Sequence, residues 1–237
     1  VTDNRLLADR PLRQPMVNVH SIGAGGGSII RHGLGGLSVG PDSAGAVPGP
    51  ACYGLGGKEP TVTDANMVLG YLNSRKILGG SIKLDPEKSF AVMKPMAEAL
   101  QVSVPELAFG IIRIANATMS RALHRVTVER GIDGRGCTLF AFGGAGPMHS
   151  AGLASEFGIN EVVIPQISSG YSALGCLMAD VNYTQQQTIR MNSDNWDSIR
   201  FTNVLDSLVN SVSAPLLARG LSDKDISIEY TAMIRYL

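Results

Sequence analysis

The chain has 237 residues, of which 44% are hydrophobic and 17% charged, a length and composition typical of a globular protein with a sizeable core rather than of a disordered one. Its 20 basic and 20 acidic residues cancel, which argues against a general binder of nucleic acid or other polyanions. No apolar run approaches the ~18 residues of a membrane span, and the first ten residues lack a signal-peptide pattern.

Cysteine usage points to a reducing compartment. The three cysteines, Cys52, Cys137 and Cys176, are far apart and form no CxxC pair. An odd number of isolated cysteines is typical of reduced proteins, so we expect a cytoplasmic protein without a cysteine-based zinc site.

Glycine dominates the first part of the chain. Of its 28 glycines, thirteen lie between Gly23 and Gly57. Alternating apolar and polar residues predict a strand at 16–22, which runs directly into this glycine-rich stretch. A hairpin-like segment follows at 29–40. The loop at 41–64 is much longer than a typical connection, and such loops in compact domains are usually functional.

The next elements are helical. Residues 64–72 fit a short helix that Thr63 or Asp64 could cap. Asp85 followed by proline starts a helix that we expect to reach residue 100. A capping box at Ser103–Glu106 opens the most regular predicted helix, 105–130, which Gly131 ends.

After residue 130 the predicted elements alternate. They are a strand at 137–142, a helix at 147–157, a strand at 161–165, a helix at 169–178, a strand at 181–191, a helix at 197–219 and a strand at 226–236. This order is typical of α/β layering, a mixed sheet with flanking helices. We divide the chain into a glycine-rich region, 1–100, and an α/β region, 101–237. The chain stops within a predicted strand, so we expect both to be parts of one larger truncated domain.

Two glycine turns could bind phosphate. The first, Gly25, Gly26, Gly27 and Ser28, follows a strand, and its backbone N–H groups could converge on an anion because no Cβ blocks the approach. The second, Gly143, Gly144, Ala145 and Gly146, links a strand to a helix N-terminus, where free N–H groups and partial positive charge favour anions. The alternatives are a merely tight turn for the first and close helix–strand packing for the second.

Four polar residues beside these turns or a helix start are candidate site residues. His20 and Asp64 are the candidate catalytic residues, while Asn66 and His149 are candidates for the vicinity of a substrate or metal. An isolated histidine is more often a hydrogen-bonded core residue, and Asp64 is most simply a helix cap. A metal role for Asp64 would need a second carboxylate nearby in space.

Several strings of this sequence closely resemble the hydantoinase A / 5-oxoprolinase family. They are VHSIGAGGGSI, VGPDSAGAVPGPACYGLGGKEPTVTDANMVLGYL, FAFGGAGPMHSAGLA and GYSALGCLMADV. The family includes N-methylhydantoinase and caprolactamase chains and the homologous subunits of acetone and acetophenone carboxylases. The resemblance runs from about residue 10 to the end.

The resemblance implies an actin-like, sugar-kinase-like ATPase fold. It implies that ATP, with Mg²⁺ as the divalent metal, phosphorylates the oxygen of a cyclic amide or a ketone and so makes ring opening or carboxylation feasible. It also implies a hydantoinase B-type partner subunit. By motif, Gly143–Gly146 would lie at the adenosine and phosphate part of the site, and Gly25–Ser28 on the phosphate or substrate side.

The sequence departs from the family's pattern in three places. Asn18 stands where the family commonly has aspartate, which puts any metal or charge role of that position in doubt. The two DGGT-like phosphate hairpins that precede this region in the family are absent, and the C-terminal string is cut after Leu237. We therefore expect the central part of a longer subunit that does not turn over ATP alone.

Three readings of the function remain open. The leading one is a fragment of an ATP-dependent subunit that hydrolyses a hydantoin or lactam through a phosphorylated intermediate. The second is a subunit of an ATP-dependent acetone or acetophenone carboxylase. The third is a non-catalytic nucleotide-binding module that completes a site with another chain.

Overall fold

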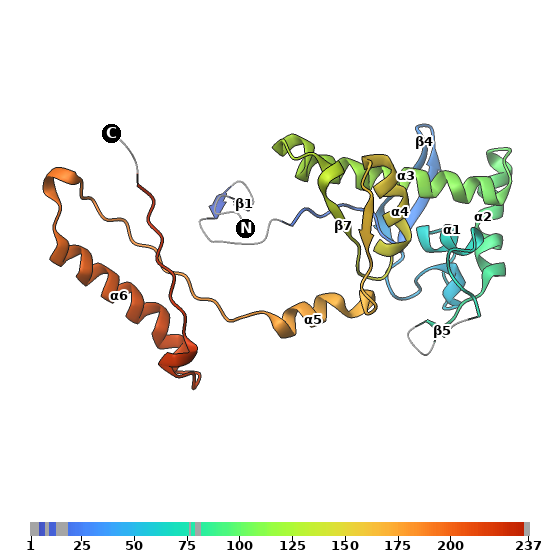
Figure 1. The fold of residues 1–237 in the computed structure, drawn as a ribbon. Helices are drawn as coiled ribbons and strands as arrows, with labels where there is room; N and C mark the ends of the chain where they lie inside the picture. Colours follow the sequence, from blue (N-terminus) through green and yellow to red (C-terminus); the bar gives the residue numbers. More distant parts are fainter. Residues whose placement is uncertain (1–4, 8–9, 13–18, 76, 79–81, 235–237) are drawn as a thin grey trace. The chain divides into compact units, whose positions relative to one another are not determined.

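The computed structural model describes residues 5–7, 10–12, 19–75, 77–78 and 82–234 (Figure 1). The chain separates into two compact units. The large unit is Val19–Met178, and the small unit combines Val1–Asn18 with Ala179–Leu237. The boundary expected at residue 100 falls inside the large unit and stays a prediction about the domains of a longer fold.

Three helices form the core of the large unit: α1 (Val62–Val68), α2 (Pro86–Ala99) and α3 (Val104–Val126). Each begins at a side-chain cap, from Thr61, Asp85 and Ser103 respectively. The caps at Asp85 and Ser103 are the predicted ones, whereas α1 begins at Thr61 and not at the predicted Thr63 or Asp64. Their apolar faces and Ile30 form one buried cluster, whose helical members are Val62, Ala65, Met93, Ala97, Leu107, Ala108, Ile111, Ile112 and Ala115. This cluster holds α1 against α3.

Short strands flank these helices. Strand β3 (Ser28–Gly33) pairs with β4 (Gly36–Ser43) in an antiparallel hairpin, which confirms the predicted hairpin. Ile29 of β3 also bridges Thr61, and this bridge brings the glycine-rich stretch to the start of α1. Strands β5 (Ile77–Leu78) and β6 (Ile82–Lys83) form a second small antiparallel pair.

The rest of the large unit is a strand–helix–strand segment. Strand β7 (Thr138–Phe140) pairs in parallel with β8 (Glu161–Val163), and α4 (Gly146–Phe157) connects them, as a parallel pair requires. Helix α5 (Tyr171–Met178) ends the unit. The large unit is therefore mixed α/β.

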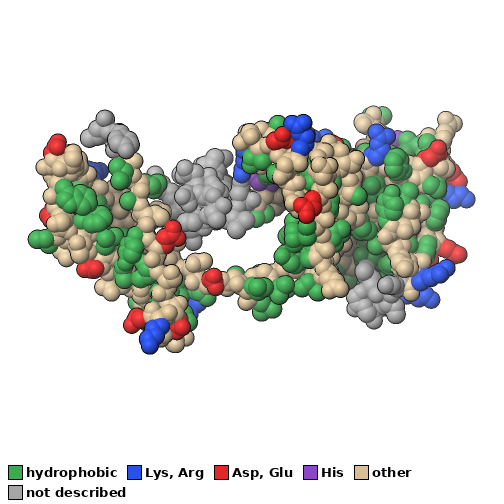
Figure 2. Space-filling view, in the orientation of Figure 1, with side chains coloured by type: hydrophobic (Ala, Val, Ile, Leu, Met, Phe, Trp, Pro, Cys, Tyr) green, Lys and Arg blue, Asp and Glu red, His purple; other side chains and the backbone are tan. Residues whose placement is uncertain are grey.

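The small unit contains the antiparallel pair β1 (Arg5–Leu7) and β2 (Arg10–Leu12) and the helix α6 (Ser198–Leu217), which Asp197 caps. Figure 2 shows hydrophobic side chains on the surface over α6, in agreement with the exposure of Ile199. Of the described hydrophobic residues of the small unit, Leu216 alone is buried. Within the described ranges, no helix is both long and apolar enough to cross a membrane.

The predicted helices are confirmed, but three predicted strands are wrong. Residues 19–22, 181–191 and 226–234 have no strand structure; the remaining positions of these predictions, 16–18 and 235–236, lie outside the described residues. A strand needs a neighbour that accepts and donates its backbone hydrogen bonds. Alternation alone cannot supply that neighbour, and none of the described residues pairs with these segments.

Candidate functional site

The two glycine turns predicted from the sequence meet in the large unit. A Cβ added to Gly26 would lie 3.5 Å from the Cβ of Ala145 and 2.8 Å from Oγ1 of Thr63. The first turn, the second turn and the start of α1 therefore converge on one point. Only glycine leaves room for this approach at position 26 without displacing a neighbour.

The first turn is closed by its own hydrogen bonds. The N–H of Gly25 donates to Oγ of Ser28 (2.9 Å), and the N–H of Ser28 donates to the carbonyl of Gly25 (3.0 Å). The carbonyl of Gly27 accepts a bond from the N–H of Ala44 (2.9 Å), at the start of the long loop. Among the described residues, none accepts a hydrogen bond from the N–H of Gly26 or Gly27.

The second turn leads from β7 into the N-terminus of α4. Gly143 has a φ of 87°, which favours glycine, and its N–H donates to the carbonyl of Ser168 (2.8 Å). No side chain caps α4. In the part of the chain that the structure describes, the N–H groups of Gly144, Ala145 and Gly146 have no acceptor. Free N–H groups at a helix N-terminus form an anion-binding arrangement.

Asp64 is a buried structural carboxylate. Its side chain is fully buried and accepts five hydrogen bonds, from the N–H groups of Ala51, Cys52 and Thr61 and from the hydroxyls of Thr61 and Ser89, at 2.7–3.2 Å. A carboxylate offers about four lone-pair sites. In this arrangement Asp64 therefore has none left for a metal or a substrate. The sequence predicted Thr63 or Asp64 as the cap of α1, but the cap is Thr61, and Asp64 is its partner at the third helical position of the capping box.

The thiol of Cys52, next to Asp64, has low reactivity. Burial, together with the charge of Asp64, raises the pKa of Cys52 to about 12. A thiol with this pKa stays protonated at neutral pH and is a poor nucleophile.

Asn66 and His149 are both buried, on α1 and α4. Nδ2 of Asn66 donates to the carbonyl of Val62 (3.0 Å). Nδ1 of His149 lies 2.8 Å from Oδ1 of Asn116 on α3. Oδ1 of Asn66 and Nε2 of His149 have no hydrogen-bond partner within the described ranges. Two such buried polar atoms are compatible with a role near a ligand, which stays a prediction.

His20 lies at the exposed surface, where its Nε2 is 3.4 Å from Nη2 of Arg130. Its catalytic role also stays a prediction. Asn18, the departure from the family's pattern, lies outside the described residues. Where the structure describes the chain, three or more His, Cys, Asp or Glu side chains nowhere gather closely enough to hold a metal ion.

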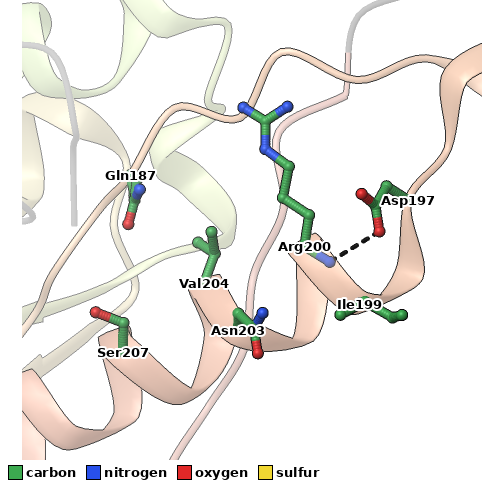
Figure 3. A pocket seen from close by; sticks show the side chains of 7 residues that line it. All are labelled: Gln187, Asp197, Ile199, Arg200, Asn203, Val204 and Ser207. Atoms are coloured by element: carbon green, nitrogen blue, oxygen red, sulfur yellow. Dashed lines mark hydrogen bonds between the residues drawn. The ribbon is translucent and has the colours of Figure 1, made fainter.

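A hollow of about 510 Å³ on the small unit does not offer comparable chemistry (Figure 3). Gln187 and residues at the start of α6 line it. Its carboxylate, Asp197, is the cap of α6 and accepts a hydrogen bond from the N–H of Arg200 (2.9 Å). The site predicted at the glycine turns lies in the other unit.

Sequence reasoning missed Thr63 and Asn116 as parts of the site. The hydroxyl and the N–H of Thr63 both donate to the carbonyl of Gly26, each at 2.8 Å. A threonine at a helix start is usually interpreted as a cap. The sequence does not reveal that the hydroxyl of Thr63 instead donates to the carbonyl of Gly26, 37 residues earlier. Asn116 lies in a helix without a motif, so only the fold shows that it contacts His149.

These features define a class: a mixed α/β protein with two convergent glycine turns, one of them at a helix N-terminus. The chain belongs to the hydantoinase/oxoprolinase family, whose model matches residues 1–185. The resemblance seen in the sequence is thereby confirmed.

Relatives of this chain carry several activities in their names. It is 43% identical to caprolactamase subunit alpha of Pseudomonas jessenii, over 94% of this chain and 33% of that protein. It is 36% identical to the acetophenone carboxylase gamma subunit of Aromatoleum aromaticum, over 90% of this chain and 30% of that protein.

Two solved structures are also similar. The ATP-dependent caprolactamase from Pseudomonas jessenii matches 89% of this chain and 31% of its own, with a TM-score of 0.71 and 41% identity. Nucleotide-free acetone carboxylase matches 92% of this chain and 32% of its own, with a TM-score of 0.78 and 31% identity. The chain thus spans about a third of the length of these relatives.

Proposed function

We propose that this chain is part of an ATP-dependent subunit of the hydantoinase/oxoprolinase type, which hydrolyses a cyclic amide. The observation that carries the proposal is the convergence of the two glycine turns at Gly26 and Ala145. The names of its relatives, an ATP-dependent caprolactamase among them, support the reaction class.

The residues present fit the polyphosphate of a nucleotide. Five N–H groups without described acceptors, those of Gly26, Gly27, Gly144, Ala145 and Gly146, lie on the two turns, and the N-terminus of α4 adds partial positive charge. A Cβ added to Gly144 or Gly146 would meet nothing within 4 Å, so the second turn is open to a ligand. These five groups would hold phosphate oxygens.

When bound, ATP supplies the phosphoryl group that converts the amide oxygen into a good leaving group. The chain's own turns orient the phosphates by backbone donation, which requires no side-chain movement. Mg²⁺ commonly binds through phosphate oxygens and water with only one or two carboxylates. A magnesium ion therefore does not need a cluster of acidic side chains in this chain.

The complete polypeptide and its partner subunit form a larger assembly in this proposal. We infer an actin-like ATPase fold for the complete polypeptide, in which residues 1–100 and 101–237 are regions of one domain. Relatives are named as alpha, beta and gamma subunits, which supports a hydantoinase B-type partner. Because the chain spans about a third of its relatives, we expect no ATP turnover by this chain alone.

A ketone carboxylase subunit is the second candidate. It is favoured by the higher TM-score to acetone carboxylase, 0.78 against 0.71 for the caprolactamase. Both reactions would use the same phosphate-binding turns, and the substrate would distinguish them.

The test is ATP hydrolysis by the full-length protein with its partner subunit, with and without candidate substrates. Stimulation by hydantoin, 5-oxoproline or caprolactam is expected. If only acetone or acetophenone with bicarbonate stimulates ATP hydrolysis, the protein is a ketone carboxylase subunit. If ATP does not bind, the proposal is wrong in both forms.

The Gly144→Val variant tests the site itself. Its branched side chain would occupy the space at the second turn, and we expect ATP to bind about tenfold more weakly or worse, a cost of about 1.4 kcal/mol, with the fold unchanged. Gly33→Val on β3 is the matched control, because Gly33 is also exposed with nothing within 4 Å of an added Cβ. Equal ATP affinity, measured by calorimetry, in the two variants would contradict this role of Gly144.

A further inference from the structure

We propose that Thr63 is a positioning residue, whose hydroxyl fixes the direction of the phosphate-binding turn at Gly26. This inference rests on the proposed function, because it concerns the same turn. The hydroxyl oxygen of Thr63 lies 2.8 Å from the carbonyl oxygen of Gly26, and the N–H of Thr63 donates to that same carbonyl at 2.8 Å. The residue is 6% exposed, so water competes little for these bonds.

Because the peptide bond is planar, the contact between Thr63 and Gly26 also fixes the direction of the next N–H group, which faces the proposed ligand. In a planar trans peptide, the C=O of one residue and the N–H of the next point in opposite directions. Two donors from Thr63 hold the C=O of Gly26 toward α1. They thereby direct the N–H of Gly27, one of the five groups proposed to bind phosphate, away from α1.

Glycine at this position has no side chain to restrain its own dihedral angles. The turn's own hydrogen bonds join Gly25 and Ser28, and the two bonds from Thr63 add a restraint on the peptide group between Gly26 and Gly27. The contact also restricts which residue can stand at position 26. An added Cβ on Gly26 would lie 2.8 Å from the Thr63 hydroxyl and 3.5 Å from Ala145.

Thr63 is itself held firmly. Thr61 caps α1 in a capping box with Asp64, and Asp64 also accepts hydrogen bonds from Ala51, Cys52 and Ser89. The first turn of α1 is thus tied to the long loop and to α2. The backbone that carries Thr63 cannot move without breaking these buried hydrogen bonds, so it is a fixed support for the turn at Gly26.

Thr63 could also serve only to stabilise the fold, and that role predicts different effects on ATP binding. Three variants of the full-length protein, studied with its partner, distinguish the two roles. Thr63→Val removes the hydroxyl donor but keeps the shape and the backbone N–H, while Thr63→Ser keeps the donor. Thr118→Val on α3 is the matched control, because Thr118 also donates a partly buried hydroxyl to a carbonyl, that of Ile114 (3.1 Å).

We expect Thr63→Val to lower ATP affinity about fivefold to tenfold, the range for one hydrogen bond, and to raise the KM for ATP in proportion. We expect Thr63→Ser and Thr118→Val to bind ATP like the wild type. Wild-type ATP affinity in Thr63→Val, or an equal loss in Thr118→Val, would overturn the inference. Failure of the wild type to bind ATP would instead refute the proposed function.

Gly26→Ala tests the same contact if Thr63→Val does not fold. Its Cβ would push the hydroxyl of Thr63 away from the carbonyl of Gly26. We expect weaker ATP binding in Gly26→Ala and no recovery in Gly26→Ala/Thr63→Gly, because the second substitution frees the space but does not return the hydroxyl donor. Recovery of wild-type affinity in the double variant would overturn the inference, since space at Gly26 and not the hydroxyl of Thr63 would then set the turn.

Discussion

The imidazole of His149 is buried between α3 and α4, with Asn116 as its hydrogen-bond partner. Burial lowers its pKa below the usual 6.5, because the interior disfavours the charged ring. Space for the pair depends on Gly152, where an added Cβ would lie 2.6 Å from Nδ2 of Asn116. A neutral histidine thus joins the helix that begins at the second glycine turn to the core helix α3.

This burial predicts a pH dependence of stability. The unfolded state binds a proton at His149 more readily than the folded state, so the stabilisation is complete above pH 6.5 and is lost as pH falls below it. The slope can reach about 1.4 kcal/mol per pH unit. We expect the free energy of unfolding, measured with urea between about pH 7.5 and 5.5, to fall more steeply in wild type than in His149→Gln.

His32 provides the control for this measurement, since it is exposed on β3. His32→Gln should retain the wild-type slope. If His149→Gln also retains it, proton binding at His149 does not contribute to the acid sensitivity.

At the scale of elements, Asp64 joins three segments: the start of α1, the loop at Ala51 and Cys52, and α2 through Ser89. We expect Asp64→Asn to lower the free energy of unfolding by about 2–3 kcal/mol, because the amide nitrogen would face buried donors and leave them unsatisfied. Urea unfolding of the chain measures this cost.

The same substitution at Asp85 is the natural comparison. Asp85 caps α2 by accepting from the N–H of Glu87 (3.0 Å), and its side chain is 40% exposed. Asparagine caps helices about as well as aspartate, so Asp85→Asn should cost less than about 0.5 kcal/mol. Similar costs at the two positions would show that Asp64 contributes no more to stability than an exposed helix cap does.

The sequence predicted the elements whose signals are local. The caps at Asp85 and Ser103 and the two glycine turns all follow from neighbouring residues. Helix α3 ends at Val126, earlier than predicted, and Gly131 instead ends the short 3-10 helix Val128–Arg130. The sequence could not predict contacts between residues that are far apart in the chain. These are the approach of Gly26 to Ala145 and the five hydrogen bonds that Asp64 accepts. The predicted strands at 181–191 and 226–236 failed for the same reason, since a strand depends on a partner that its own sequence does not specify.

At the scale of the whole molecule, the two units differ in how much apolar surface they bury. The large unit holds the helical core around Val62 and Ile111, whereas in the small unit Trp196, Ile199 and Met233 are 57%, 74% and 92% exposed. Stability within a protein follows such differences, because segments with few buried contacts open first.

Amide hydrogen exchange of this chain should therefore be uneven. We expect the slowest exchange in α1 and α3 and fast exchange at residues 181–191 and 226–234, where the structure describes no strand pairing. In the full-length protein, the proposed larger fold predicts slower exchange in those two segments, because their strand-like alternation would find hydrogen-bonding neighbours. Equally fast exchange in both proteins would mean that the alternation has no partner, and that α6 and its flanking segments lie outside the sheet of the ATPase domain.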